Sequence, residues 1–142
     1  MNLKMRVLLA DDSDLILERL KEVLCSMEQV EIVASLRNGN ETLEAIKVLK
    51  PELAIVDIKM PGLSGLEVLN EIRKENKSIK FIVLTLFASD YYRQLADIAG
   101  ADYFFSKVDD FDKVAIAVDD VLHNGKNYYS HEKDTNNFIS HN

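Results

Sequence analysis

Residues 53–62 read Leu53-Ala54-Ile55-Val56-Asp57-Ile58-Lys59-Met60-Pro61-Gly62, and their pattern is the strongest indication of the fold. An apolar run ends at a single acid and is followed by a Pro-Gly turn. A short apolar run bounded by turn signals is typical of a strand buried on both faces of a parallel sheet. Asp57 then lies at the C-terminal end of the strand, where ligands bind in open α/β sheets. Taken alone, Asp57 is equally well read as a residue that ends a strand and starts a turn.

Segments of two periodicities alternate along the rest of the chain. Segments whose apolar residues recur every 3.6 positions, as in a helix, separate the apolar runs. The predicted strands are 5–10, 30–36, 53–57, 80–85 and 102–106. Five strand–helix pairs joined by short connections predict a doubly wound α/β fold with right-handed crossovers. We expect a flavodoxin-like, five-stranded parallel sheet in the strand order 2-1-3-4-5, with five helices.

Three details of the helices are also predicted. Cys25 falls among apolar positions of the first helix, which suggests a small core residue. Ile98 falls on the apolar stripe of the fourth helix. The last helix is predicted to open at Asp109-Asp110, to carry Phe111 on its stripe and to close at Asn124-Gly125.

Composition limits the domain organisation and the partners. The 142 residues suit one domain, predicted over 1–125, followed by a polar tail, 126–142, that we expect to be mobile. The net charge of −7 argues against direct binding of nucleic acid. The sequence shows neither a membrane-spanning apolar run nor a convincing signal peptide. A lone cysteine cannot form an internal disulfide, so a reducing cytoplasm is the simplest location.

Polar residues stand at the C-terminal ends of four predicted strands: Asp11 and Asp12, Asp57, Thr85, and Lys107. If the first and third strands are neighbours, the three carboxylates converge. Two carboxylates about 4 Å apart repel by about 4 kcal/mol at an effective dielectric constant near 20, so the cluster needs a cation. Hard oxygen ligands with room for water suit Mg²⁺. Ca²⁺ fits less well without an EF-hand-type loop, and the cysteine and histidines lack the ligand spacing of a zinc site.

Thr85 and Lys107 complete an anion-receiving pocket around Asp57. A hydroxyl, an ammonium and a metal ion beside one carboxylate can neutralise a phosphoryl group in transfer. Asp57 would then be the nucleophile that forms an acyl phosphate. Each residue also has an ordinary structural role, as a partner of a helix N-terminus, a strand former or a solvated loop residue. Their joint occurrence at four strand ends is what points to function.

With these residues in place, the chain resembles a response-regulator receiver domain, similar to the chemotaxis-type single-domain receivers. The resemblance covers about residues 5 to 123. The matching residues are Asp11-Asp12, Asp57-Ile58-Lys59-Met60-Pro61, Gly65-Leu66-Glu67, Leu84-Thr85, Gly100-Ala101-Asp102 and Lys107. The run 101–107 also resembles receivers that precede DNA-binding domains.

The resemblance implies roles for the acids. Asp57 accepts a phosphoryl group from a phosphohistidine on a sensor histidine kinase or a histidine phosphotransfer protein. Asp12 and Asp57 bind Mg²⁺ directly, together with the backbone carbonyl of Lys59. Asp11 acts on the metal through water.

The resemblance also implies a switch. Lys107 pairs with the phosphate, and Thr85 hydrogen-bonds it and moves toward it. Phe104 matches the aromatic switch position and would rotate into the vacated space, which reshapes the face formed by the fourth helix, fifth strand and fifth helix. Alternatively, Phe104 is an ordinary strand aromatic. Homodimerisation through the fourth-helix face is a habit of this family.

The sequence departs from the family pattern at several positions. Val108 replaces a common proline, so a cis peptide bond after Lys107 is not expected. Leu86 is larger than the usual small residue after the threonine. Lys59 and Phe87 occupy positions that tune hydrolysis in this family, and neither is a good acceptor for orienting water. We therefore expect slow self-dephosphorylation.

The leading hypothesis is a two-component phospho-switch without its own effector domain, acting through an unknown downstream protein or as a phosphorelay carrier. It would catalyse only its own phosphorylation and slow dephosphorylation. The alternatives are a phosphorylation-independent docking module and an aspartate-nucleophile phosphatase. The phosphatase reading is disfavoured because Lys59 stands where such enzymes carry a second acid.

Overall fold

Five parallel strands form one sheet in the computed structural model, which describes residues 3–124. The strands are β1 (Met5–Ala10), β2 (Val30–Leu36), β3 (Leu53–Val56), β4 (Lys80–Thr85) and β5 (Tyr103–Ser106). Their order is β2-β1-β3-β4-β5, which confirms the predicted flavodoxin-like topology. The connection from β2 to β3 crosses β1, so β1 and β3 are direct neighbours and their C-terminal ends meet.

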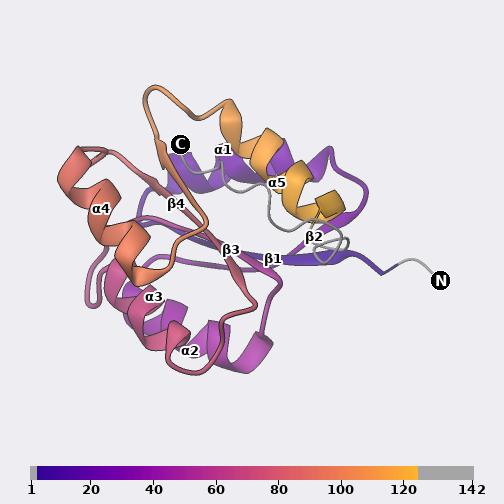
Figure 1. Ribbon diagram of the computed structural model, residues 1–142. Coiled ribbons are helices and arrows are strands. Elements are labelled where there is room, and N and C mark those ends of the chain that lie inside the picture. Colours follow the sequence, from indigo (N-terminus) through magenta and orange to yellow (C-terminus); the bar gives the residue numbers. More distant parts are fainter. Residues whose placement is uncertain (1–2, 125–142) are drawn as a thin grey trace.

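Helices cover both faces of the sheet (Figure 1). They are α1 (Asp14–Cys25), α2 (Gly39–Leu49), α3 (Gly65–Arg73), α4 (Asp90–Ala99) and α5 (Lys113–Asn124). Because side chains alternate along a strand, β1 sends Val7 and Leu9 to one core and Leu8 and Ala10 to the other. The first core is closed by α1 and α5 and the second by α2, α3 and α4. A central sheet buried on both sides explains the nearly continuous apolar runs.

Two side-chain predictions are wrong. Cys25, the last residue of α1, is exposed because the buried stripe of that helix runs through Leu17, Leu20 and Leu24. Ile98 is 82% exposed. The buried positions of α4 are the small Ala96 and Ala99, and Ile98 points away from the core that they contact.

The predicted start of the last helix is also wrong, because α5 begins at Lys113 rather than at Asp109-Asp110. The Asp110 carboxylate instead accepts a hydrogen bond from the backbone N–H of Ser106 and pairs with Lys113. Phe111 precedes the helix but still packs against the core beside α5. The acids therefore shape the connection between β5 and α5 instead of opening the helix.

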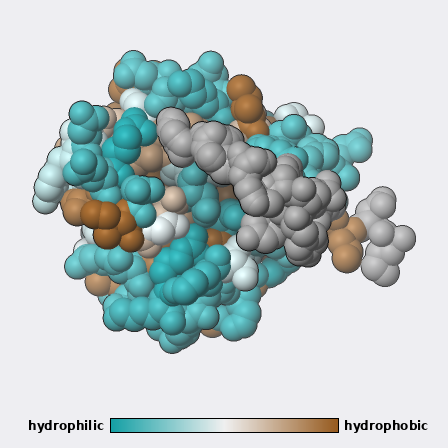
Figure 2. Space-filling view, viewed as in Figure 1, coloured by the Kyte–Doolittle hydropathy of each residue, from teal (hydrophilic) through white to brown (hydrophobic). Residues whose placement is uncertain are grey.

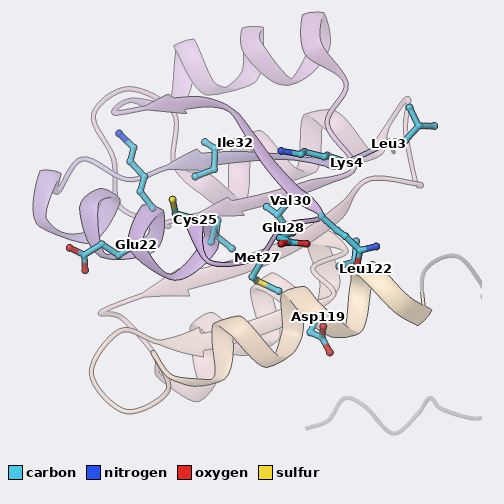
Figure 3. A pocket seen from close by; sticks show the side chains of 13 residues that line it. Leu3, Lys4, Glu22, Cys25, Met27, Glu28, Val30, Ile32, Asp119 and Leu122 are labelled. Atoms are coloured by element: carbon cyan, nitrogen blue, oxygen red, sulfur yellow. The ribbon is translucent and has the colours of Figure 1, made fainter. Parts of the chain in front are cut away.

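A hollow lies away from the predicted site, between the end of α1, the start of β2 and α5. It is lined by residues that include Cys25, Met27, Val30, Asp119 and Leu122 (Figure 3). It lies at the N-terminal edge of the sheet, opposite Asp57, and none of the predicted site residues lines it. Outside the grey atoms, the face seen in Figure 2 is mostly hydrophilic, and its hydrophobic residues form small separate patches.

Within residues 3–124, no helix has the length and apolar character needed to cross a bilayer. The predicted tail, 126–142, and the predicted domain boundary at residue 125 lie outside the described residues.

Candidate functional site

The acids converge because β1 and β3 are paired in register. Ala10 lies opposite Val56, and the backbone N–H of Asp57 donates to the carbonyl of Ala10 at 2.9 Å. The residue after each strand therefore projects from the same edge. One carboxylate oxygen from each of Asp11, Asp12 and Asp57 lies within 4.8 Å of the others. The predicted clustering of the three acids is present.

Lys107 joins two of these carboxylates. Its Nζ lies 2.7 Å from Oδ2 of Asp11 and 2.9 Å from Oδ2 of Asp57. All three residues are buried, with Asp11 1%, Asp57 5% and Lys107 7% exposed. Burial alone would lower the pKa of Lys107, but the two carboxylates outweigh it and the pKa lies above its usual value. The ammonium therefore stays charged at neutral pH.

At Asp11, in contrast to Lys107, burial outweighs the charged and hydrogen-bonded partners. Burial raises the pKa of its carboxyl group, and the hydrogen bonds from Lys107 and from the backbone N–H of Ser13 oppose this only in part. The carboxylate is thus costly to keep ionised in the protein alone. Such a site gains from additional positive charge nearby.

The donor set fits a hard divalent cation. Three carboxylates and one ammonium carry a formal charge of −2, which a divalent ion would balance. Asp12 is exposed, so one side of the cluster is open to water ligands, as Mg²⁺ requires. The carboxylates thus suit the predicted Mg²⁺ site, and the ligand roles of Asp11, Asp12, Asp57 and the Lys59 carbonyl stay predictions.

Thr85 ends β4, next to β3, and is fully buried. Its Oγ1 accepts a hydrogen bond from the backbone N–H of Phe87 at 3.0 Å, and its carbonyl accepts one from the backbone N–H of Lys107 at 2.9 Å. Thr85 is therefore connected through the backbone both to the residue that binds the acids and to the segment that leads into α4.

A close backbone approach fixes the loop after Asp57. The N–H of Gly65, the first residue of α3, donates to the carbonyl of Ile58 at 2.8 Å. A Cβ on Gly65 would lie 2.0 Å from the carbonyl oxygen of Asp57, so only glycine fits. The neighbouring Ser64 caps α3 in a reciprocal capping box with Glu67. The start of α3 therefore sets the position of the acceptor loop.

The loop after Lys107 has the features expected without a proline. No cis peptide bond occurs among the described residues, as predicted from Val108. The hydroxyl of Ser106 accepts hydrogen bonds from the backbone N–H groups of Val108 and Asp109. The Ser106 side chain and the Asp110 carboxylate therefore hold this loop through hydrogen bonds to its backbone.

The remaining predicted residues contact groups that the sequence reasoning did not identify. The Lys59 ammonium lies over the rings of Phe87 and Tyr92. Phe104 is half-buried, and Arg93 lies 4.6 Å from its ring centroid. Tyr92 and Arg93 both belong to the first turn of α4, whereas Phe87 precedes the helix. Neither Tyr92 nor Arg93 was among the predicted site residues, because no local pattern signals contacts between distant segments.

Comparison with known proteins identifies the relatives of this chain. A family model described as the response regulator receiver domain matches residues 7–119. The transcriptional regulatory protein YvfU of Bacillus subtilis, itself uncharacterised, is 35% identical over 127 residues, which are 89% of this chain and 63% of YvfU. DesR of the same organism is 32% identical over 126 residues, which are 89% of this chain and 62% of DesR. The chain thus spans less than two thirds of these relatives.

Solved structures agree with this relationship. A DNA-binding response regulator of the LuxR family from Staphylococcus aureus has a TM-score of 0.76 and 29% identity, covering 82% of this chain and 98% of that one. The response regulator domain of CheB from Thermotoga maritima has a TM-score of 0.75 and 26% identity, covering 92% and 99% of the two chains. Similar structures therefore include a DNA-binding response regulator and the response regulator domain of CheB.

Proposed function

The chain belongs to the response regulator receiver domain family of two-component systems, and on this premise we propose that it is a switch operated by phosphorylation of Asp57. The observation that carries the proposal is the bridge that the Lys107 ammonium makes between the buried carboxylates of Asp11 and Asp57. A buried lysine shared by two acids at the open edge of a sheet is arranged to receive an anion there.

The chemistry assigned to Asp57 is nucleophilic. One of its carboxylate oxygens forms a bond to phosphorus while the bond from phosphorus to a histidine nitrogen of the donor protein breaks. The bonding electron pair stays on the imidazole nitrogen, and the product on this chain is an acyl phosphate. Lys107 binds a phosphoryl oxygen, and Thr85 donates its hydroxyl hydrogen to another.

Asp11, Asp12, Asp57 and the carbonyl of Lys59 would hold Mg²⁺. The ion would supply neutralisation of the charge that builds up on the phosphoryl oxygens. The burial of Asp11 and Asp57 supports this assignment, because acids held together in a low-dielectric site gain most from a cation.

The output proposed is a change of surface. Phosphorylation adds a charge of about −1.5 to −2, which would draw Thr85 toward Asp57. Phe104 lies opposite Val83 in the sheet. Its ring would then rotate inward and lose its contact with Arg93. The face of α4, β5 and α5 would thereby change for a downstream protein, or the group would pass on in a phosphorelay.

The proposed donor is a sensor histidine kinase or a histidine phosphotransfer protein, in the cytoplasm. Domain 1–125 would carry the switch, with the polar tail beyond it. We propose that this domain does not itself bind nucleic acid, and that it turns over nothing except its own phosphoryl group. Homodimerisation through the α4 face is the oligomer that the family suggests.

The test is intact mass after incubation with acetyl phosphate and Mg²⁺. We expect one phosphate-sized gain that is lost in Asp57→Asn and in the presence of a chelator. Because Leu86 is 62% exposed beside the site and could hinder a small donor, a phosphohistidine protein is the second donor. If neither donor phosphorylates the wild type, a phosphorylation-independent docking module becomes the better interpretation.

A further inference from the structure

Three side chains meet where the loop after Asp57 faces the start of α4. The Lys59 Nζ lies 5.3 Å from the ring centroid of Phe87 and 5.5 Å from that of Tyr92. The two ring centroids are 6.2 Å apart and the rings are tilted by 60°. Both distances from the ammonium are within the range of about 6 Å for a cation–π interaction. One charge is thus held by two rings from a different segment of the chain.

Each member of this cluster is tied to a different part of the proposed switch. Lys59 follows Asp57 by two residues, and Phe87 follows Thr85 by two residues. Tyr92 lies in the first turn of α4, where its N–H donates to the capping hydroxyl of Ser89. The cluster therefore joins the acceptor loop to the fourth helix.

The cluster is also coupled to the Thr85 hydroxyl. Oγ1 of Thr85 accepts the backbone N–H of Phe87 at 3.0 Å. A shift of this hydroxyl toward Asp57 must lengthen that hydrogen bond or move the backbone of Phe87 with it. The first change removes a restraint on the backbone of Phe87, and the second moves the Phe87 ring relative to the ammonium.

Among the described residues, no carboxylate lies within 4.0 Å of the Lys59 Nζ. The partners of its charge are therefore the rings of Phe87 and Tyr92. A phosphoryl group on Asp57, two residues away, would be a stronger partner for an ammonium than two aromatic faces. The same event that moves Thr85 would therefore also compete for Lys59.

We propose that Lys59, Phe87 and Tyr92 form a cation–π latch, which holds the segment from Thr85 to the first turn of α4 in its unphosphorylated arrangement and opens when Asp57 carries a phosphoryl group. Tyr92 is the positioning residue of this latch. The inference rests on the proposed function of Asp57 and adds a restraint on the transition. Opening the latch frees the start of α4 to move.

The experiment measures binding of beryllofluoride with Mg²⁺, as a phosphoryl mimic, from the amide resonances of residues 90–99. Tyr92→Leu removes one ring of the latch but keeps an apolar side chain. A cation–π contact at a partly exposed site is worth about a two- to five-fold change in an equilibrium. We expect the half-saturating beryllofluoride concentration to fall by that factor in Tyr92→Leu.

Two comparisons separate the latch from a merely structural effect. In a Lys59→Met background, Tyr92→Leu should leave the half-saturating beryllofluoride concentration unchanged, because the ammonium that the Tyr92 ring contacts is absent. Tyr91→Leu is the matched control, since Tyr91 is 65% exposed and touches Tyr92 but has no ring contact with Lys59. Its midpoint should match that of the wild type.

An equal effect of Tyr92→Leu in both backgrounds, or no effect in either, overturns the latch while leaving Asp57 as the acceptor. If the wild type shows no response to beryllofluoride, the proposed function fails, and a latch opened by phosphorylation fails with it. The two failures are distinguishable because only the second abolishes binding in the wild type.

Discussion

Lys107 is the residue on which the electrostatics of the site depend. It is the ammonium shared by Asp11 and Asp57, and all three side chains are almost fully buried. Removing one partner of a buried charge pair leaves a charge that neither water nor protein compensates. Removing a member of this charge cluster should therefore lower the free energy of unfolding, by an amount that depends on pH.

We predict that Lys107→Met lowers the free energy of unfolding at pH 7 by about 3 kcal/mol without Mg²⁺. Burial already raises the pKa of Asp11, and the variant removes the lysine that opposes it. An acid whose pKa is higher in the folded than in the unfolded state loses stability as pH rises, so the deficit should shrink toward the unfolded pKa near 4. Urea denaturation at pH 7 and pH 4.5 measures this. Equal stabilities of variant and wild type at pH 7 would contradict it.

A second prediction concerns the metal. Mg²⁺ should raise the thermal unfolding midpoint of the wild type, because a ligand that binds only the folded state stabilises it. Asp12→Ala should lose this response. Asp14→Ala is the matched control, since Asp14 lies outside the three-acid cluster and pairs with Arg37. A Mg²⁺ response that survives in Asp12→Ala, or disappears in Asp14→Ala, would argue against the proposed ligands.

The third prediction concerns the lifetime of the acyl phosphate. Lys59 and Phe87 contact each other and offer no acceptor to orient an attacking water. Self-dephosphorylation should be slow, and Lys59→Asn or Phe87→Glu should speed it. The decay of the phosphorylated mass with time is the measurement. Rapid decay that neither substitution changes would rule out this role for the two side chains.

At the scale of elements, the start of α3 positions the acceptor loop. Gly65→Ala places a Cβ against the Asp57 carbonyl, and the atoms it meets are backbone atoms of Asp57 and Ile58, which have little room to adjust. We predict a loss of about 2 kcal/mol in the free energy of unfolding, together with slower phosphorylation, because the shift reaches Asp57.

Ser64→Ala is the comparison for Gly65→Ala. It removes the helix cap at the neighbouring position and should cost about 1 kcal/mol. Because it adds no atom against Asp57, its phosphorylation rate should stay near that of the wild type. Equal rates for the two variants would show that the close approach does not control the acceptor. Urea denaturation and the time course of phosphorylation supply both numbers.

The elements also show what sequence reasoning can and cannot reach. The strands and helices themselves could be predicted, because each period reports its own local geometry. The strand order was expected from the usual topology of five such strand–helix units. The first residue of α5 could not be predicted in this way, because the Asp110 carboxylate accepts a hydrogen bond from the Ser106 N–H in the loop instead of opening the helix. The exposure of Cys25 and Ile98 depends on where a helix ends and how closely it packs. Neither property can be inferred from the spacing of apolar residues along the sequence.

At the scale of the whole molecule, the strand order creates the site. Placing β1 beside β3 brings together acids that are 46 positions apart, Asp11 and Asp57, and β4 and β5 bring Thr85 and Lys107 to the same edge. The grouping of the carboxylates could be predicted because the ends of parallel strands share an edge. The contact of Lys59 with Tyr92 could not, since it depends on the path of two loops.

The most direct measurement is to locate the phosphoryl group. After phosphorylation with a phosphohistidine donor and Mg²⁺, reduction with borohydride converts an aspartyl phosphate to homoserine, and peptide mass spectrometry identifies its position. We predict homoserine at position 57 and unmodified Asp11 and Asp12. Homoserine at position 11 or 12, or at no position, would contradict the assignment of Asp57 as the acceptor.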